Sequence, residues 1–276
     1  MINWVATYTV RKQLMAAGNN QISIEEYFNK FIALKTNFGK ELLKRDFEKI
    51  FPGKSALFIQ RWKLIADYFS EYLIRPSVVS TIDKPEFARL LPRLSDDEKV
   101  AVILFLLPCI LPDNTRKRAA TSTINEGTSS ATSSRQGRNR LSLKERRDSC
   151  FLQIEDPTNF NSCVQEHQRL LKSSGLSFQP TIAFVGPLDA VESSYVFVNE
   201  IIYPVSSPLE ALNHCFQIFW VLDCKYPLRA NIIWSFLQTA GYQITTKDRL
   251  TQAVVTLNHN INEKINAANN IANPPL

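Results

Sequence analysis

The sequence has few of the residues on which several common kinds of functional site depend. Of its 276 residues, 8 are Gly, 5 are Cys and 3 are His. So few glycines leave little material for a glycine-rich nucleotide loop, and so few cysteines and histidines leave little for a disulfide framework or a multi-histidine metal centre. Since 45% of the residues are hydrophobic and 21% are charged, we still expect an ordinary folded chain.

Features of a secreted or membrane protein are also missing. The first residues contain no basic region ahead of an apolar core, as a secretory signal would. The five cysteines have no framework spacing, which favours reduced thiols. The apolar run Val100–Leu111 is shorter than the about 20 residues of a spanning helix and contains Pro108, so it predicts a buried helix. We therefore expect an intracellular protein with no membrane role, and nucleus and cytoplasm stay open.

Charge is unevenly distributed along the chain, whose net charge is +6. Basic residues outnumber acidic ones by 16 to 12 in residues 1–112 and by 9 to 4 in residues 113–148, whereas residues 149–276 have 7 basic and 10 acidic residues. A nucleic-acid-binding domain needs a dense basic face, because neutralising phosphates supplies most of its affinity. If any part of this chain binds phosphate, the middle segment is the candidate.

The composition divides the chain into three parts. From Asp113 to about Arg140, Ser, Thr, Arg and Asn dominate, and so polar a stretch cannot bury enough apolar area to offset the entropy of ordering it. The sequence therefore predicts a helical domain in residues 1–112, a basic Ser/Thr/Arg-rich disordered linker in residues 113–148, and an α+β domain with a helical tail in residues 149–276. The two folded regions need not touch.

Helix signals dominate the first region, and the second mixes helices with strands. Capping residues, prolines and apolar residues at three-to-four spacing predict helices over 24–38, 55–74, 85–91, 95–107, 160–172, 208–225 and 228–240. Runs of β-branched and aromatic residues predict strands over 181–185, 195–198 and 201–203. The fold class is thus mainly α, with a helical N-terminal domain and an α+β C-terminal domain whose small antiparallel sheet packs on helices.

The tail contains an apolar stripe at alternating spacings of four and three. Its residues are Leu250, Val254, Leu257 and Ile261. This stripe predicts either docking on the tail's own domain or a short coiled-coil seam that would make a homo-oligomer.

Basic residues of the middle segment are the candidate contacts for phosphate, nucleic acid or an import receptor. They are Arg116, Lys117, Arg118, Arg135, Arg138, Arg140, Lys144, Arg146 and Arg147. A basic linker with neither role is the alternative. Ser149 follows two arginines in a pattern that basophilic kinases accept, so it is a candidate for regulatory phosphorylation.

No residue is assigned a catalytic, metal-binding or cofactor-binding role. A zinc site would need Cys163, His167, His214 and Cys215, but the last two are adjacent on one helix and point about 100° apart. The carboxylates of Asp189, Glu192 and Asp223 would be needed for a metal-dependent nuclease, but Asp189 and Glu192 fit a solvated loop better and Asp223 fits a helix end. The aromatic residues Tyr195, Phe197, Trp220 and Trp234 have the periodicity of core residues, which argues against base stacking.

Several short motifs of the C-terminal region resemble a known group of proteins. The motifs are the helix start Ser207–Glu210, the pair Phe216 and Phe219, the break Tyr226–Pro227, the helix segment Trp234–Gln238 and, upstream, the stretches Phe51–Trp62 and Val100–Arg118. They resemble uncharacterised animal proteins labelled sterile-alpha-motif-domain-containing-protein-three-like, although the sterile alpha motif itself is not seen. The resemblance implies descent from a mobile element and carries no catalytic residues.

These observations favour a non-enzymatic interaction protein of mobile-element origin, which binds a protein partner through its α+β domain. The alternative is a nucleic-acid-associated protein that binds DNA or RNA through the basic linker. A metal-dependent nuclease remnant is the third reading.

Overall fold

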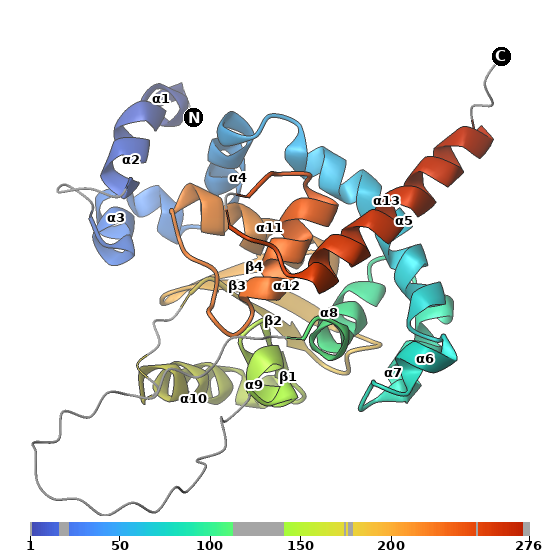
Figure 1. The fold of residues 1–276 in the computed structure, drawn as a ribbon. Coiled ribbons are helices and arrows are strands. Elements are labelled where there is room, and N and C mark those ends of the chain that lie inside the picture. The colour runs from blue at the N-terminus through green and yellow to red at the C-terminus, as the bar shows by residue number, and fades with distance from the viewer. Residues whose placement is uncertain are drawn as a thin grey trace, which may run out of the picture.

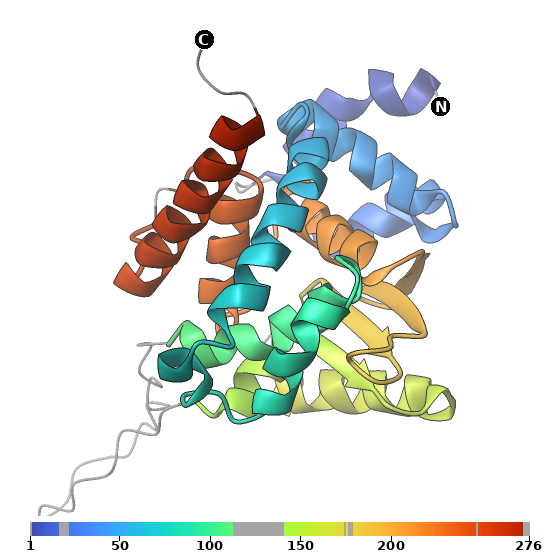
Figure 2. The same cartoon turned by 90° about the vertical axis from the view of Figure 1, so that its right-hand side faces the viewer.

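The fold is known from a computed structural model, which describes residues 2–16, 22–112, 141–173, 175, 179–246 and 248–272. Within them the protein is mainly helical and contains one four-stranded sheet, as the sequence predicts (Figure 1). Helix α1 (Ile2–Ala6) and the described end of α13 (Gln252–Ala272) lie at the end of the molecule opposite α10 (Phe160–Ser173) (Figures 1 and 2). No helix of the described residues is long and apolar enough to cross a membrane.

The first region is all helical. Its helices are α1 (Ile2–Ala6), α2 (Tyr8–Met15), α3 (Ile24–Lys30), α4 (Gly39–Ile50), α5 (Lys54–Tyr72), α6 (Pro76–Val79), α7 (Pro85–Leu90) and α8 (Lys99–Ile110). The single helix expected over 24–38 is wrong, because α3 ends at Lys30 and a 3₁₀ turn follows. At the start of α4 a Cβ on Gly39 would lie 2.2 Å from the carbonyl oxygen of Leu34, so only glycine permits this close approach.

The three predicted strands pair antiparallel as expected, and a fourth strand that was not predicted makes the sheet mixed. Its strands β1 (Phe151–Ile154), β2 (Thr181–Val185), β3 (Ser193–Val198) and β4 (Ile201–Val205) lie in that order. The last three pair antiparallel, whereas β1 pairs parallel to β2. Because α10 (Phe160–Ser173) connects β1 to β2, the chain returns to the start of the sheet before β2 begins, and parallel pairing results.

Helices cover both faces of the sheet. Helix α11 (Pro208–Val221) packs on the face that belongs to the main core, and α10 covers the other face with a small cluster of its own (Figure 1). Ser207 caps α11 by accepting a hydrogen bond from the backbone N–H of Glu210, as the sequence predicts.

One hydrophobic core includes side chains from both regions that the sequence separates. The core contains Phe47 and Phe58 from the first region and Phe216 and Tyr242 from the second, each at most 1% exposed. The ring centroids of Phe47 and Phe216 lie 6.0 Å apart. The structure therefore differs from the expectation of two bodies that need not touch, because the apolar faces of α4 and α5 are covered by α11.

The last described elements are α12 (Asn231–Phe236), a π-helical turn over Leu237–Gly241, and α13 (Gln252–Ala272), which packs on α5 and crosses it in Figure 1. The apolar stripe of α13 is buried in the main core: Val254 and Ile261 are fully buried, Leu257 is 5% exposed, and Leu250 packs beside them half-buried. Docking on the chain's own core is thus confirmed, and the homo-oligomer seam through these four side chains is wrong.

Residues 143–148 fold into a short helix, which corrects the predicted extent of the linker. Helix α9 (Leu143–Asp148) packs against α8. Ser142 and Glu145 form a capping box at its start. The remainder of the predicted linker, residues 113–140, lies outside the described residues.

Candidate interaction groove along strand β1

A groove of about 870 Å³ lies between α9, β1 and α10. Its lining residues are Phe105, Lys144, Arg147, Asp148, Phe151, Leu152, Gln153, Glu155, Asp156, Asn159, Ser162, Cys163, Glu166, His167 and Leu170. They belong to the end of α8, to α9, to β1 with the turn after it, and to α10. In Figure 1, α9, β1 and α10 lie together at the lower side of the molecule.

Strand β1 presents an open edge to this groove. It is the end strand of the sheet, and among the described residues only β2 pairs with it. The backbone N–H of Gly186 donates to the carbonyl oxygen of Ile154, so Ile154 and Leu152 direct their backbone polar groups toward β2. Because these groups alternate in direction along a strand, those of Phe151 and Gln153 point toward the groove.

The opposite edge of the sheet carries residues that hinder pairing with a further strand. Strand β4 contains Pro204, which has no N–H to donate, and the carbonyl oxygen of Pro204 accepts a hydrogen bond of 3.2 Å from Lys40 Nζ. Natural sheets protect their edges with proline and lysine in this way. The edge of β1 has neither device, since its sequence is Phe-Leu-Gln-Ile.

The two walls of the groove have apolar parts. On one side Phe151 belongs to the main core and Phe105 packs against it. On the other side Leu152 and Cys163 pack on the small cluster beneath α10, and the side chain of Leu170 is 50% exposed. Side chains of an added strand would alternate between these walls, because successive side chains point to opposite faces of a sheet.

Acidic side chains outnumber basic ones in the lining. Asp148, Glu155, Asp156 and Glu166 face Lys144 and Arg147, which gives a formal charge of −2 to the lining of a chain whose net charge is +6. Lys144 pairs with Asp148 at 2.8 Å, and Glu166 pairs with Arg169 at 2.6 Å. Asp156 accepts hydrogen bonds from Thr158. In the part of the chain that the structure describes, no hydrogen bond or ion pair engages the exposed carboxylate of Glu155.

Arg146 and Arg147 hold α9 on α8, which corrects their assignment to a cation chain that does not fold. They are 4% and 8% exposed. Arg146 donates to the carbonyl oxygens of Pro108 and Leu111, in the last turn of α8, where carbonyls lack helical partners. Arg146 therefore satisfies carbonyls at the C-terminal end of α8, where a cation is favoured.

Arg147 also anchors the segment before α7. It donates two hydrogen bonds of 2.7 and 2.6 Å to the carboxylate of Asp83, and a third from Nε to the carbonyl oxygen of Phe105. Its guanidinium carbon lies 3.6 Å from the centre of the Phe105 ring. Hydrogen bonding from Arg147 lowers the pKa of Asp83.

The other candidate residues of the basic segment are placed only in part. Lys144 is exposed on α9, and the Ser149 hydroxyl donates to the carbonyl oxygen of Glu145 at 2.9 Å. The remaining candidates, Arg116, Lys117, Arg118, Arg135, Arg138 and Arg140, lie outside the described residues.

The residues considered for metal binding are not gathered into a site. Cys163 and His167 lie on α10, whereas His214 and Cys215 lie on α11, on the opposite face of the sheet. Among the described residues no three His, Cys, Asp or Glu side chains form a metal-binding group, and this includes Asp189, Glu192 and Asp223.

Of the four aromatic residues that the sequence assigns to the core, two are buried as expected and two are half-buried. Phe197 and Trp234 are buried, which confirms the prediction. Tyr195 and Trp220 are half-buried and make edge contacts with Phe160 and Phe51 at centroid distances of 4.8 and 4.9 Å.

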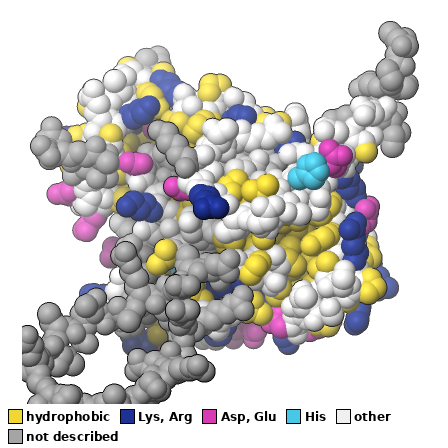
Figure 3. Space-filling view, viewed as in Figure 1, with side chains coloured by type: hydrophobic (Ala, Val, Ile, Leu, Met, Phe, Trp, Pro, Cys, Tyr) yellow, Lys and Arg dark blue, Asp and Glu magenta, His cyan; other side chains and the backbone are white. Residues whose placement is uncertain are grey.

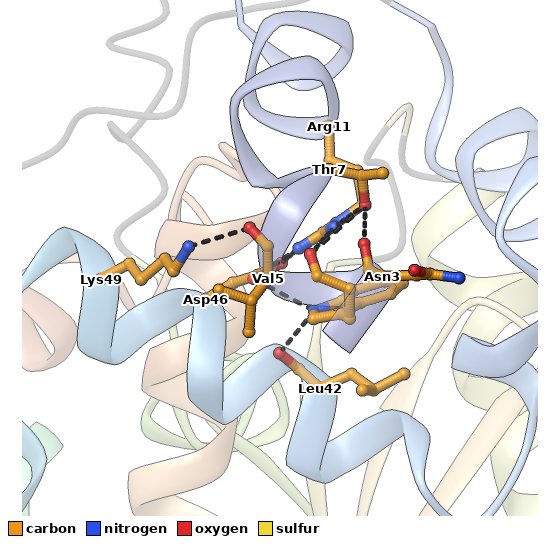
Figure 4. Close-up of polar contacts among 8 residues, drawn as sticks. Asn3, Val5, Thr7, Arg11, Leu42, Asp46 and Lys49 are labelled. Carbon is orange, nitrogen blue, oxygen red and sulfur yellow. Dashed lines mark hydrogen bonds and ion pairs between the residues drawn. The ribbon is translucent and has the colours of Figure 1, made fainter. Parts of the chain in front are cut away.

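A second cluster of polar side chains holds the N-terminal helices α1 and α2 on α4 (Figure 4). Arg11, 1% exposed, donates to both carboxylate oxygens of Asp46 at 2.6 and 2.9 Å. Its guanidinium carbon lies 3.5 Å from the centre of the Trp4 ring, and Trp4 Nε1 donates to the same carboxylate. Although burial raises the pKa of Asp46, these donors surround the carboxylate, so the cluster joins α1 and α2 to α4.

A third polar group is enclosed by α11. The hydroxyl of Ser55 accepts from Asn213 at 3.0 Å and from Gln217 at 2.9 Å, and Tyr242 donates to Asn213 at 2.9 Å. Next to them His214 is 5% exposed, and burial lowers its pKa to about 4. An uncharged imidazole at this depth is a packing residue.

Sequence reasoning missed β1, α9 and the groove between them. The capping pair Ser142 and Glu145 has the same spacing as the box used to predict a helix start at Ser95, so this signal was available. The four residues of β1 lack the length and alternation that identify a strand.

The face viewed in Figure 3 has no continuous basic area among the residues that the structure describes. Lys and Arg side chains are scattered there with Asp and Glu side chains among them, and hydrophobic side chains gather in its right-hand half. This mixture lacks the dense basic face of a nucleic-acid-binding domain. No family model, curated protein or solved structure matches this chain.

Proposed function

We propose that the protein is a non-enzymatic interaction protein that binds an extended segment of a partner protein along the open edge of β1. The observation that carries this proposal is the strand edge at the base of the groove between α9 and α10, with which no described residue pairs. An added strand is a recurring way in which proteins recognise extended peptides.

Backbone hydrogen bonding and side-chain packing support the proposal together. The outward peptide groups of Phe151 and Gln153 offer donors and acceptors for a ladder. The walls at Phe105 and Leu170 offer apolar contact to side chains on both faces of the added strand. Affinity then comes from the main chain and specificity from the walls.

The competing nucleic-acid proposal has weaker support. Of the nine basic residues on which it depends, Arg146 and Arg147 are buried and bonded within the chain. We also propose the mobile-element ancestry that the resemblance implies, which is compatible with a protein partner. We expect the protein to act in the nucleus or the cytoplasm.

Selection from a random peptide library on the full-length chain tests this function. Peptides of about eight residues are long enough to pair with β1 and extend past both of its ends. Gln153→Pro removes the outward N–H of residue 153 and leaves the inward hydrogen bonds of Leu152 and Ile154 in place. We expect selected peptides to bind the wild type and to lose at least about tenfold in affinity on the Gln153→Pro variant.

Gln153→Ala is the matched control, since it deletes the side chain and keeps the N–H. It should bind the peptides within about threefold of the wild type. Protection of the Cys163 thiol from alkylation by a bound peptide gives a second measurement if the proline variant unfolds, because Cys163 lines the groove. Selected peptides that bind the proline variant equally well and leave Cys163 unprotected would refute the proposal.

A further inference from the structure

We infer that the segment bound in the groove is basic, with a Lys or Arg side chain directed at the carboxylates that follow β1. This inference rests on the proposed function and adds the chemical class of the partner. It starts from the contrast between the acidic lining, of formal charge −2, and the basic chain that contains it.

The position of the carboxylates decides where the cation lies. Glu155 and Asp156 directly follow β1, so an added strand that pairs with Gln153 passes beside them at its end. A strand advances about 3.3 Å per residue, and a Lys or Arg one or two positions beyond the pairing with Gln153 reaches Glu155.

Glu155 is the carboxylate with the most to gain from a partner. Asp148 and Glu166 already pair with Lys144 and Arg169, and Asp156 accepts two hydrogen bonds from Thr158. The side chain of Glu155 is exposed at the mouth of the groove. A guanidinium or ammonium group there gains an ion pair without breaking one.

The apolar walls fix the rest of the preferred sequence. One wall presents Phe105, whose ring also packs 5.2 Å from that of Phe87, and the other presents Leu170. An extended segment that meets both walls has apolar side chains at successive positions and a cation at the end near Glu155. The structure thus favours a short apolar strand with a basic end.

The test measures how tightly peptides selected on the wild type bind to charge variants of the full-length chain. We expect selected peptides to be enriched in Lys and Arg at one end. Glu155→Lys should weaken their binding by about five- to tenfold, and Glu155→Gln by about two- to fivefold. Raising the salt from about 50 to about 300 mM should reduce the difference between the wild type and Glu155→Lys.

Glu263→Lys is the matched control, because Glu263 is exposed on α13 and does not line the groove. It makes the same charge change and should leave affinity within about twofold. Thermal melting of each variant confirms that the variants compared are folded.

The outcomes separate the inference from the function on which it rests. Selected peptides that depend on Gln153 but have no excess of Lys or Arg, or are unaffected by Glu155→Lys, would overturn the inference and leave the function standing. If no peptide distinguishes the wild type from Gln153→Pro and none protects Cys163, both are overturned. Binding that appears only after deletion of residues 113–140, or pairing of two copies through β1, would name a different occupant and overturn the inference.

Discussion

The ring of Phe58 stacks on the ring of Tyr242, with centroids 4.3 Å apart and planes inclined by 3°. The other face of Tyr242 stacks on Phe216 at 3.7 Å. Phe58 belongs to α5 in the first region, whereas Tyr242 and Phe216 belong to the second. This stack of three rings is the most direct link between the two regions.

Gly241→Ala is expected to destabilise the protein, although alanine usually stabilises a helical position. A Cβ at residue 241 would lie 2.7 Å from a ring carbon of Phe58. The resulting overpacking should lower the free energy of unfolding by about 1–3 kcal/mol, measured by urea denaturation. Phe58→Leu makes room, so the double variant should lose less than the sum of the two single losses. A Gly241→Ala variant as stable as the wild type contradicts this contact.

The two regions should not fold apart. Separating residues 1–112 from residues 141–276 would expose Phe47, Phe58, Phe216 and Tyr242 to water. We expect neither fragment alone to unfold cooperatively in thermal circular dichroism, and we expect a mixture of the two to regain a cooperative transition. A sharp, native-like transition of fragment 1–112 alone would show that the shared core is dispensable.

Arg147 should matter far more to stability than Lys144, three residues earlier on the same helix. Arg147→Ala removes the bonds to Asp83 and Phe105, and we expect the free energy of unfolding to fall by about 1–3 kcal/mol. Arg147→Lys should recover little, because an ammonium group cannot donate the same set of bonds. Lys144→Ala should stay within about 0.5 kcal/mol of the wild type in the same urea titration. Equal effects of the two alanine substitutions would argue against the α9 anchor.

His214 should make the protein less stable in mild acid. Burial lowers its pKa from 6.5 to about 4, so below pH 6.5 the unfolded chain binds a proton that the folded chain does not. Stability from this group is therefore complete above pH 6.5 and declines as the pH falls toward 4, by about 3 kcal/mol in total.

His214→Gln removes this titration and keeps a polar side chain of similar length. The loss of unfolding free energy between pH 7 and pH 5 should be smaller in the variant than in the wild type. Measuring both proteins at each pH cancels the contribution of other acidic groups. Parallel pH profiles of the two proteins would contradict a depressed His214 pKa.

Much of the fold follows from local signals in the sequence. The expected strand over 181–185 is observed with the same bounds, and the helix expected from residue 55 begins at Lys54 and ends two residues earlier than expected, at Tyr72. Caps, prolines and hydrophobic periodicity act within a few residues of one another, so a sequence alone displays them. The start of α11 at Pro208 after the cap Ser207 is the clearest example.

The groove could not be predicted because it depends on contacts between distant segments. Strand β1 exists through pairing with β2, and α9 is held in place by Asp83 and the end of α8. The same arginines fit a basic linker when judged by composition alone. Arg146 takes its structural role from the backbone carbonyls of Pro108 and Leu111, and Arg147 takes its role from Asp83. No sequence pattern brings these partners near the two arginines.

Pro204 and Lys40 have a consequence for how copies of this protein can aggregate. A fibril that grows by strand pairing needs each molecule to pair with a neighbour at both edges of its sheet. Here Pro204 and Lys40 hinder pairing along the edge of β4. Edge-to-edge growth would stop at a pair, so the protein can keep one strand accessible in a crowded cell without the usual hazard of polymerising through it.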